Sequence, residues 1–333
     1  MKIAVIGAGG IGGYLAARLA LAGASVTCIA RGPNLEAIRA GGLRLIEEDG
    51  TERHADTVRA VASAADAGPH DLVLLALKAH QVAAVVPDLR VLLADHTPIV
   101  TLQNGIPWWY FHRLAGPYEG LAVRSVDPDG SIAAGVDAAR VIGAVVYPAS
   151  ELIAPGVVKV IEGNRFSLGE PDNSKSDRIL RVAEMLTQAG FKAPVSTDIR
   201  SEIWLKLWGN LTFNPVSALT HATLAQICRF SATRELARQM MTEAQTVAEK
   251  LGVRFRISID RRIAGAEAVG EHKTSMLQDV EQGRRLELDA LLGSVIELAR
   301  LTQTPTPACD AIYACCALLA DTLSTRQARL SIS

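Results

Sequence analysis

Lys2-Ile-Ala-Val-Ile-Gly7-Ala-Gly9-Gly-Ile-Gly12 stands at the start of the chain and contains the pattern that decides the fold. A short apolar run leads directly into three glycines spaced as G-x-G-x-x-G, and residues 14–22 then resemble a helix of small side chains. In a strand–turn–helix unit these glycines allow a tight turn, approach of the backbone to a pyrophosphate and close helix packing. The helix N-terminus offers free N–H groups to phosphates. We therefore predict a dinucleotide site rather than an ordinary turn, with contacts from Gly7, Ala8, Gly9, Gly10, Ile11 and Gly12.

The end of the second predicted strand bears on the choice between NADH and NADPH. The apolar run Ser25–Ala30 is followed by Arg31. An NAD site usually has Asp or Glu near this position, about twenty residues past the glycines, to bind the ribose 2′-hydroxyl. A guanidinium can instead bind a 2′-phosphate through two hydrogen bonds. The alternative is an arginine on an exposed loop. The position favours NADPH as the cofactor, with Arg31 as a contact.

Length and composition limit the class of protein. The 333 residues are enough for two domains, and the net charge of −1 with a pI near 6.7 indicates neither a nucleic-acid partner nor an anionic membrane surface. The longest uninterrupted apolar stretch, residues 311–320, is much shorter than the ~20 residues of a membrane span. No charged segment followed by an apolar one precedes the first strand, so we expect no signal peptide and a cytoplasmic protein.

Cysteines and histidines give no sign of a metal site. The five cysteines are odd in number and form no C-x-x-C pair, as expected of reduced packing residues. The seven histidines occur singly, without the spacing of metal ligands. We therefore predict that the protein has no metal cofactor.

The order of the predicted elements indicates two domains. Strands are predicted at residues 2–6, 25–30, 41–46, 71–77, 98–102, 141–148, 157–161, 165–168 and 191–195, helices at 14–22, 33–40 and 174–189, and a hairpin turn at Asp49-Gly50. Beyond Asp198 strand patterns nearly vanish and apolar residues recur with a helical period. We predict an α/β fold with an N-terminal Rossmann-type dinucleotide-binding domain, residues 1–197, and a C-terminal all-helical substrate and catalytic domain, residues 198–333.

A polar stripe on one predicted helix marks a candidate ligand site. Within the apolar segment 201–219, four polar residues recur at every fourth position and therefore share one helix face: Glu202, Lys206, Asn210 and Asn214. A helix that is apolar on its other sides is a buried helix, and polar groups inside it are costly unless they face a partner or a wet cleft. One interpretation is an ion pair between Glu202 and Lys206 on a partly exposed face. The other is a polar ligand site in which Lys206 donates a proton or binds an anion.

Several segments together resemble the ketopantoate reductase (2-dehydropantoate 2-reductase) family. They are Lys2–Gly12, Leu77–Val82, Gln103–Gly105, Glu202–Leu219, Ser275–Asp279 and Leu286–Asp289, and their order and spacing are more specific than any one segment. In that family NADPH delivers a hydride to the C2 ketone of a 2-oxo acid, giving the 2-hydroxy acid. The resemblance implies reduction of 2-dehydropantoate (ketopantoate) to pantoate, a step in pantothenate and coenzyme A biosynthesis.

The resemblance also implies roles for individual residues. Lys206 is the implied general acid that protonates the developing alkoxide, and Glu287 is implied to act in catalysis near Lys206 and the cofactor. Substrate contacts are implied for Asn104, Asn210, Asn214 and Ser275. Cofactor contacts are implied for Lys78, Asn104, Ala149 and Glu287, beside the glycine turn and Arg31.

The chemistry of these side chains agrees with that reaction. Hydride attack on a ketone develops negative charge on oxygen, which a lysine ammonium can stabilise and then neutralise. A carboxylate such as Glu287 can hold the ammonium in place and keep it charged. Two residues keep a second interpretation, because Asn104-Gly105 is also a favoured turn pair and Lys78 can be a lysine that merely leaves the sheet edge.

Other functions remain open at this level. The aromatic segment 108–112 allows a related dehydrogenase that acts on a larger or aromatic hydroxy acid. A non-catalytic NADPH sensor is a third hypothesis, although a sensor has no use for the proton donor Lys206. Since the glycine turn and Lys206 fall in different predicted domains, we expect the active site between the domains. The oligomeric state stays open, a homodimer included.

Overall fold

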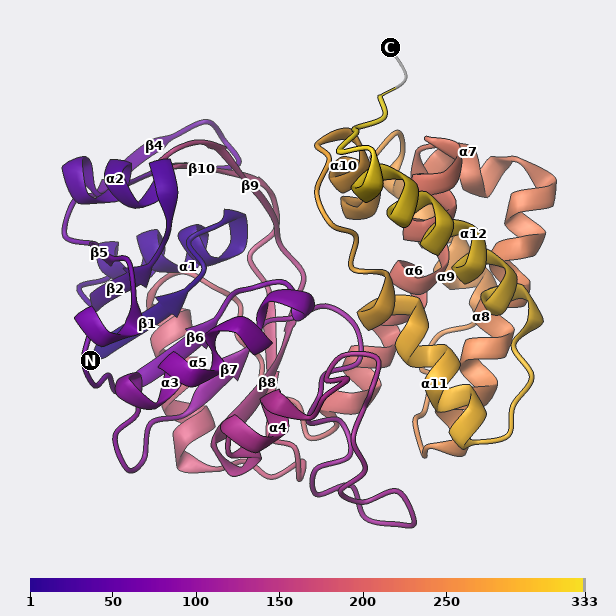
Figure 1. The fold of residues 1–333 in the computed structure, drawn as a ribbon, viewed down its shortest axis with the longest axis horizontal. Helices are drawn as coiled ribbons and strands as arrows, with labels where there is room; N and C mark the ends of the chain where they lie inside the picture. Colours follow the sequence, from indigo (N-terminus) through magenta and orange to yellow (C-terminus); the bar gives the residue numbers. More distant parts are fainter. Residues whose placement is uncertain (332–333) are drawn as a thin grey trace. The chain divides into compact units, whose positions relative to one another are not determined.

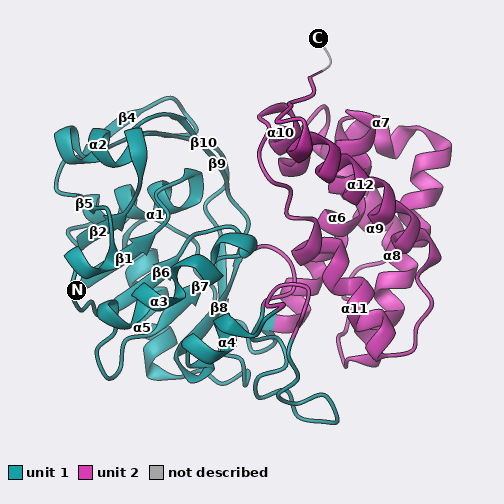
Figure 2. Ribbon diagram, in the orientation of Figure 1, with its two compact units in different colours: residues 1–103, 108–122, 129–199 teal, residues 104–107, 123–128, 200–333 magenta. Residues whose placement is uncertain are grey.

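The computed structural model describes residues 1–331, so the final two residues of the predicted helical domain lie outside the described residues. The chain divides into two compact units (Figure 2). Unit 1 comprises residues 1–103, 108–122 and 129–199, and unit 2 comprises residues 104–107, 123–128 and 200 onward. Two short segments from the first half of the chain are therefore part of the unit that holds the C-terminal helices.

Unit 1 is built on a mostly parallel sheet (Figure 1). Its strands are β1 (Lys2–Ile6), β2 (Ser25–Ile29), β5 (Arg59–Val61), β6 (Leu72–Leu75), β7 (Ile99–Thr101), β8 (Val141–Val146) and β11 (Phe166–Gly169). The seven strands lie in the order β11-β8-β7-β6-β1-β2-β5, and only the β8–β11 pair is antiparallel. The strand order reverses between β1 and β6, and open α/β sheets bind ligands at the carboxyl ends of strands at such a point.

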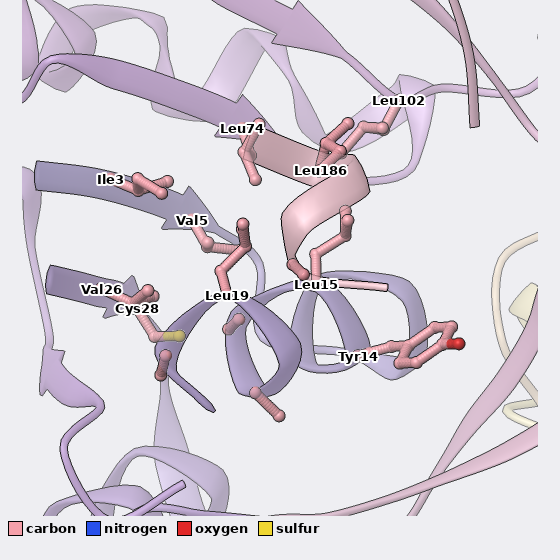
Figure 3. Packing of buried hydrophobic residues seen from close by; sticks show 14 of the residues in the cluster. Ile3, Val5, Tyr14, Leu15, Leu19, Val26, Cys28, Leu74, Leu102 and Leu186 are labelled. Atoms are coloured by element: carbon pink, nitrogen blue, oxygen red, sulfur yellow. The ribbon is translucent and has the colours of Figure 1, made fainter. Parts of the chain in front are cut away.

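Both faces of this sheet are covered, which explains its continuous apolar strands. Alternate residues of β1 and β6, such as Val5 and Leu74, belong to one buried cluster with helices α1 (Gly10–Leu21) and α5 (Asp177–Gln188). Figure 3 shows Leu15 and Leu19 of α1 among these strand residues and Leu186 of α5. The intervening strand residues, such as Ile6, are equally buried and point to the opposite face.

A smaller sheet with strand order β4-β3-β10-β9 completes the β-structure of unit 1. Its strands are β3 (Leu43–Ile46), β4 (Glu52–Ala55), β9 (Ala149–Ala154) and β10 (Val157–Glu162). The antiparallel β3–β4 pair and Gly50 at φ +85 confirm the predicted hairpin turn. The remaining helices of the unit are α2 (Gly32–Gly41), α3 (Val86–Leu89), α4 (Ser131–Gly135) and five 3₁₀ turns, η1 (Ala64–Asp66), η2 (Ala79–Gln81), η3 (Ala83–Val85), η4 (Arg90–Leu92) and η5 (Ala138–Arg140).

The strand predicted at residues 191–195 is wrong. This segment forms only isolated bridges, between Arg165 and Lys192 and between Leu168 and Val195. Pro194 lacks the backbone N–H that a continuous ladder requires, although its carbonyl accepts from the N–H of Leu168 at 2.9 Å. Strands β5 and β9 were not predicted, because β5 has only three residues and β9 has no buried residue.

Within the described residues the regular elements of unit 2 are all helices, and this confirms the predicted fold class. Its helices are α6 (Ile199–Thr220, whose first residue belongs to unit 1), α7 (Leu224–Arg229), α8 (Ser231–Lys250), α9 (Ile259–Val269), α10 (Ser275–Glu281), the π-helix η6 (Asp289–Gly293), α11 (Ser294–Leu301) and α12 (Pro307–Thr325). Helix α6 is buried as predicted, since Trp204 and Trp208 are fully enclosed. The indole N–H of Trp208 donates to the Met241 carbonyl at 2.7 Å.

Helix α12 differs from the other long helices in its exposure. Of its 19 residues only Cys309 and Cys316 are buried, and Leu318 is 67% exposed. By length and mean hydropathy, 1.2, it is the one helix among residues 1–331 that could cross a membrane. The uninterrupted apolar stretch inside it is shorter, because Asp310 and Asp321 flank it. Its composition alone is weak support for a membrane span.

Candidate active site

The glycine turn after β1 has the geometry that a dinucleotide site needs. Gly7 has φ +95, a conformation that side chains other than glycine rarely adopt. A Cβ on Gly12 would lie 1.9 Å from the Gly7 carbonyl oxygen, so only glycine lets α1 pack so closely on the strand. A Cβ on Gly9 would meet no atom within 4 Å. The space beside Gly9 is therefore open to an approaching phosphate.

The N-terminus of α1 is prepared for an anion. Gly9 occupies the N-cap position without a side-chain cap, and the first turn carries no acidic residue. Its N–H groups therefore remain available to phosphate oxygens. Strand β9 closes one side of this turn, because a Cβ on Gly10 would lie 2.2 Å from the carbonyl oxygen of Ser150. Ala149, the predicted cofactor contact, is the neighbouring residue on β9.

Arg31 is the second residue after β2, lies at the N-cap position of α2 and is exposed. Three residues later, Asn34 fixes the start of this helix to the glycine turn, a connection that the sequence analysis missed. Its Nδ2 donates to the Ala8 carbonyl at 2.7 Å, and its Oδ1 accepts from the backbone N–H of Gly156 at 2.8 Å. Asn34 therefore ties the loop that presents Arg31 to the loop between β1 and α1.

Lys78 follows β6, at the carboxyl edge where the strand order reverses. Its backbone N–H donates to Gln81 Oε1 at 3.1 Å. Gly7 packs against this same segment, since a Cβ there would lie 2.8 Å from the Ala76 carbonyl oxygen. The predicted cofactor residues of unit 1 thus come from the segments that follow β1, β2 and β6 and from the start of β9, and they are Gly7–Gly12, Arg31, Lys78 and Ala149.

In unit 2 the polar stripe of α6 meets the short segment 104–107. Lys206 Nζ donates to Asn104 Oδ1 at 2.6 Å, across 102 positions of sequence. Both residues were predicted for the site, and the structure brings them into direct contact. Asn104 therefore does more than shape a turn, because its side chain also accepts a hydrogen bond from Lys206.

The electrostatic surroundings of Lys206 suit a proton donor. Burial lowers the pKa of Lys206 from 10.5 to about 8, and the negative charge of Glu287 opposes this shift. A lysine in this range can be charged near neutral pH and can still release its proton, which is what general acid catalysis requires. Lys206, Asn104 and Glu287 thus form one interacting group.

The remaining residues of the stripe lie further along α6. Asn214 is buried, and its Nδ2 donates to Ser275 Oγ, at the first position of α10, at 3.3 Å. Asn210 is partly buried and lies between Lys206 and Asn214 on the same helix face. Amide and hydroxyl groups of this kind can bind a carboxylate or hydroxyl of a ligand.

The aromatic segment 108–112 serves packing in unit 1. Trp109 and Phe111 are buried, and the Trp109 indole N–H donates to Thr101 Oγ1 at 3.0 Å. The Trp109 ring covers Gly143, where a Cβ would lie 2.6 Å from the ring. An aromatic substrate is therefore not needed to explain this segment. Among residues 1–331 no group of three or more His, Cys, Asp or Glu side chains could hold a metal ion.

Two models of known protein families match the chain one after the other. The model described as "Ketopantoate reductase PanE/ApbA" matches residues 3–173, and the model described as "Ketopantoate reductase PanE/ApbA C terminal" matches residues 198–320. The chain belongs to the ketopantoate reductase family. The family that the sequence resembles is thereby confirmed.

Relatives of ketopantoate reductase type match over nearly the whole chain. A 2-dehydropantoate 2-reductase of Mesorhizobium japonicum is 58% identical over 315 residues, 94% of this chain and 96% of that protein. A solved structure from Ralstonia solanacearum MolK2, assigned as a ketopantoate reductase, has 38% identity and a TM-score of 0.92, with 96% of this chain and 98% of that chain covered. The solved structure of D-mandelate dehydrogenase with NADH and anilino(oxo)acetate has a TM-score of 0.83, and the match covers 97% of this chain and 100% of that chain. Its sequence identity is 23%, so the similarity shows a shared fold alone.

Proposed function

We propose that this member of the ketopantoate reductase family reduces 2-dehydropantoate to pantoate with NADPH. The observation that carries the proposal is the Lys206 ammonium, which is held by Asn104 and influenced by Glu287 in a partly buried site. A proton donor of this kind is what the reduction of a ketone to an alcohol needs, and a sensor protein would not need it. The 58% identical 2-dehydropantoate 2-reductase supports the choice of substrate.

The glycine turn and the uncapped start of α1 fit the pyrophosphate of a dinucleotide, with Lys78 and Arg31 as further contacts. A bound nicotinamide cofactor would supply the hydride. Arg31 supports NADPH over NADH, because no acidic residue stands at the end of β2 to accept hydrogen bonds from the ribose. The reaction requires that the cofactor held by unit 1 and the substrate held by unit 2 meet.

In the proposed mechanism the residues of unit 2 bind the 2-oxo acid and supply the proton. Ser275 and the amides of Asn210 and Asn214 donate hydrogen bonds to the substrate carboxylate and hydroxyl groups. Lys206 donates to the ketone oxygen, stabilises the negative charge that develops there and transfers its proton to complete the alcohol. Asn104 holds the lysine side chain in one orientation through its Oδ1, and its Nδ2 can donate to the substrate.

The substrate is tested by following NADPH consumption with a panel of 2-oxo acids. We expect the highest kcat/KM with 2-dehydropantoate, and much lower values with pyruvate and with benzoylformate, the oxo acid that corresponds to mandelate. A clear preference for benzoylformate would replace the proposal by an aromatic hydroxy-acid dehydrogenase. Absence of turnover with every oxo acid, in a protein that binds NADPH, would favour the sensor hypothesis.

The pH dependence of the reaction should follow the protonation of Lys206. Reduction needs the ammonium form, so kcat for reduction is expected to fall by up to about tenfold per pH unit once the pH exceeds the lowered pKa of about 8. Oxidation of pantoate needs the neutral amine, so its kcat should rise through the same range. Steady-state kinetics in both directions measure this, with Glu287→Gln expected to move both profiles to lower pH. If kcat changed with pH in the same way in both directions, Lys206 would not be the group that donates and accepts the proton.

The location and oligomeric state complete the proposal. All five cysteines are free and four of them are buried, which supports a reducing compartment such as the cytoplasm.

We propose a homodimer, supported by the largely apolar and exposed surface of α12, since large exposed apolar patches commonly mark contact surfaces. The mass in solution by light scattering tests this, and a monomer at micromolar concentration would contradict it.

A further inference from the structure

The helix that follows Glu287 begins with an irregularity. Residues Asp289–Gly293 form a π-helix, with α11 continuing directly from it. A π-helix shifts the hydrogen-bond pattern by one residue, and such turns are frequent at functional sites. The carbonyl oxygen of Ala290 in this turn accepts from the backbone N–H of Ile106 at 3.1 Å and from Ser294 Oγ at 2.8 Å. The π-helix thereby binds the segment 104–107.

Gly105 allows this contact. It has φ +89, and a Cβ at this position would lie 2.0 Å from the Ala290 carbonyl oxygen and 2.5 Å from its carbon. Backbone atoms cannot move aside as the end of a flexible side chain can. Gly252, also in unit 2, has nearly the same backbone conformation, φ +84, but a Cβ there would meet no atom within 4 Å. The requirement at Gly105 is therefore for close approach as well as for conformation.

The two residues on either side of Gly105 link the π-helix to the candidate proton donor. Ile106 is bonded to Ala290, and Asn104 accepts from the Lys206 ammonium at 2.6 Å. The π-helix is also joined to the acidic residue of the site, because the N–H of Leu291 donates to the Glu287 carbonyl at 3.3 Å. One turn of helix is thus hydrogen-bonded to the backbone of Glu287 and to that of Ile106, two residues after Asn104.

We propose that Gly105 and the Ala290 carbonyl form a positioning device that holds Asn104 against Lys206 for proton transfer. This inference rests on the proposed function of Lys206. Because Asn104 Oδ1 accepts from the ammonium, the amide is oriented with its Nδ2 directed away from Lys206 and available as a donor. Loss of the device would leave Asn104 and Lys206 present but poorly oriented, and misplacement by about 1 Å can cost about 10²-fold in rate.

The test compares Gly105→Ala with its matched control Gly252→Ala. Both substitutions place alanine at positive φ, so both carry the same kind of backbone strain. Only Gly105→Ala also places a Cβ against the Ala290 carbonyl, so that the two backbone segments must move apart. We expect Gly105→Ala to lower kcat by about 10–10²-fold and Gly252→Ala to leave it near the wild-type value. Equal effects of the two substitutions on kcat, with equal melting temperatures, would overturn the inference.

A double-variant experiment separates positioning from a general structural effect. If Gly105 acts through Asn104, the double variant that combines Asn104→Ala and Gly105→Ala should have a kcat no lower than that of the slower single variant. The pH above which kcat for reduction falls should decrease in Asn104→Ala and in Gly105→Ala, because the ammonium loses an acceptor that favours its charged form. Glu287, the charged group that acts on Lys206, is unchanged in both. Additive losses with an unchanged pH profile would overturn the inference.

A measurement on the wild-type protein covers the case in which Gly105→Ala does not fold. The backbone amide of Ile106 should exchange its hydrogen slowly, because it is bonded to the Ala290 carbonyl. Exchange as fast as in an exposed loop would overturn the inference without any variant. A wild type that is inactive on all oxo acids yet protects Ile106 would overturn the proposed function, and with it the catalytic part of the inference, while the hydrogen bond between Ile106 and Ala290 would stand.

Discussion

Lys206→Ala is expected to lose about 10²–10⁴-fold in kcat for the reduction of 2-dehydropantoate, the range typical for removal of a general acid. The ammonium acts mainly in the transition state, when the ketone oxygen carries developing charge, so its loss should appear in turnover. Folding and NADPH affinity should stay near the wild-type values, because the glycine turn belongs to unit 1. Steady-state kinetics, a melting temperature and NADPH titration measure the three quantities.

Two comparisons sharpen this result. Glu287→Ala should lose less than Lys206→Ala, because it changes the charge and position of the donor without removing it. Lys273→Ala, at an exposed lysine paired with Glu281, is the matched control and should keep full activity. Small primary amines added to Lys206→Ala should restore part of the rate if proton transfer is what was lost. Near wild-type turnover of Lys206→Ala would mean that this lysine has a structural role only.

Arg31→Ala is expected to erode the preference for NADPH over NADH by roughly 1–3 kcal/mol, the size of a hydrogen bond to a charged group. The guanidinium is exposed at the start of α2, so the proposed contact with a 2′-phosphate needs no change in the buried core. The loss should be confined to NADPH, since NADH has no 2′-phosphate. Dissociation constants for both cofactors, measured by fluorescence titration, give the preference directly.

Two further variants test the specificity of this effect. Arg39→Ala removes a partly exposed arginine near the opposite end of α2 and should leave the preference unchanged. Arg31→Asp supplies the acidic group that an NAD site uses for the ribose hydroxyls, so it should favour NADH. If the wild-type protein binds NADPH and NADH with equal affinity, Arg31 does not select the cofactor.

Much of the fold could be predicted because its signals are local. The glycine spacing of residues 7–12 determines a turn whose geometry depends on neighbouring residues, and the structure has that turn. The apolar strands 2–6 and 72–75 are buried on both faces of the sheet. Such burial requires a continuous apolar run in the sequence, and these runs predict the two strands. The stripe through Lys206 depends only on helical periodicity, and α6 spans it without interruption.

The features that were not predicted depend on contacts between distant residues. The hydrogen bond between Asn104 and Lys206 joins positions 102 residues apart, and no local sequence pattern predicts it. The π-helix at Asp289–Gly293 lies in a segment with ordinary helical periodicity, and its partner, Ile106, is a loop residue. The failed strand at 191–195 shows the converse, because its side chains suit a strand while Pro194 prevents a continuous ladder.

The composition of unit 2 has a consequence for any attempt to express it alone. Glu297 of α11 accepts the backbone N–H groups of Arg124 and Ser125, both at 2.7 Å, and Ala290 accepts that of Ile106. A fragment that starts at Arg200 lacks all three donors and would leave these acceptors, together with Lys206, without their partners from the first half of the chain. The gene segment for the helices is therefore not a transferable module. Exchanging this segment between homologues should succeed only if residues 104–107 and 123–128 are exchanged together with it. Recombination at residue 200 alone should yield poorly folded or inactive chimeras.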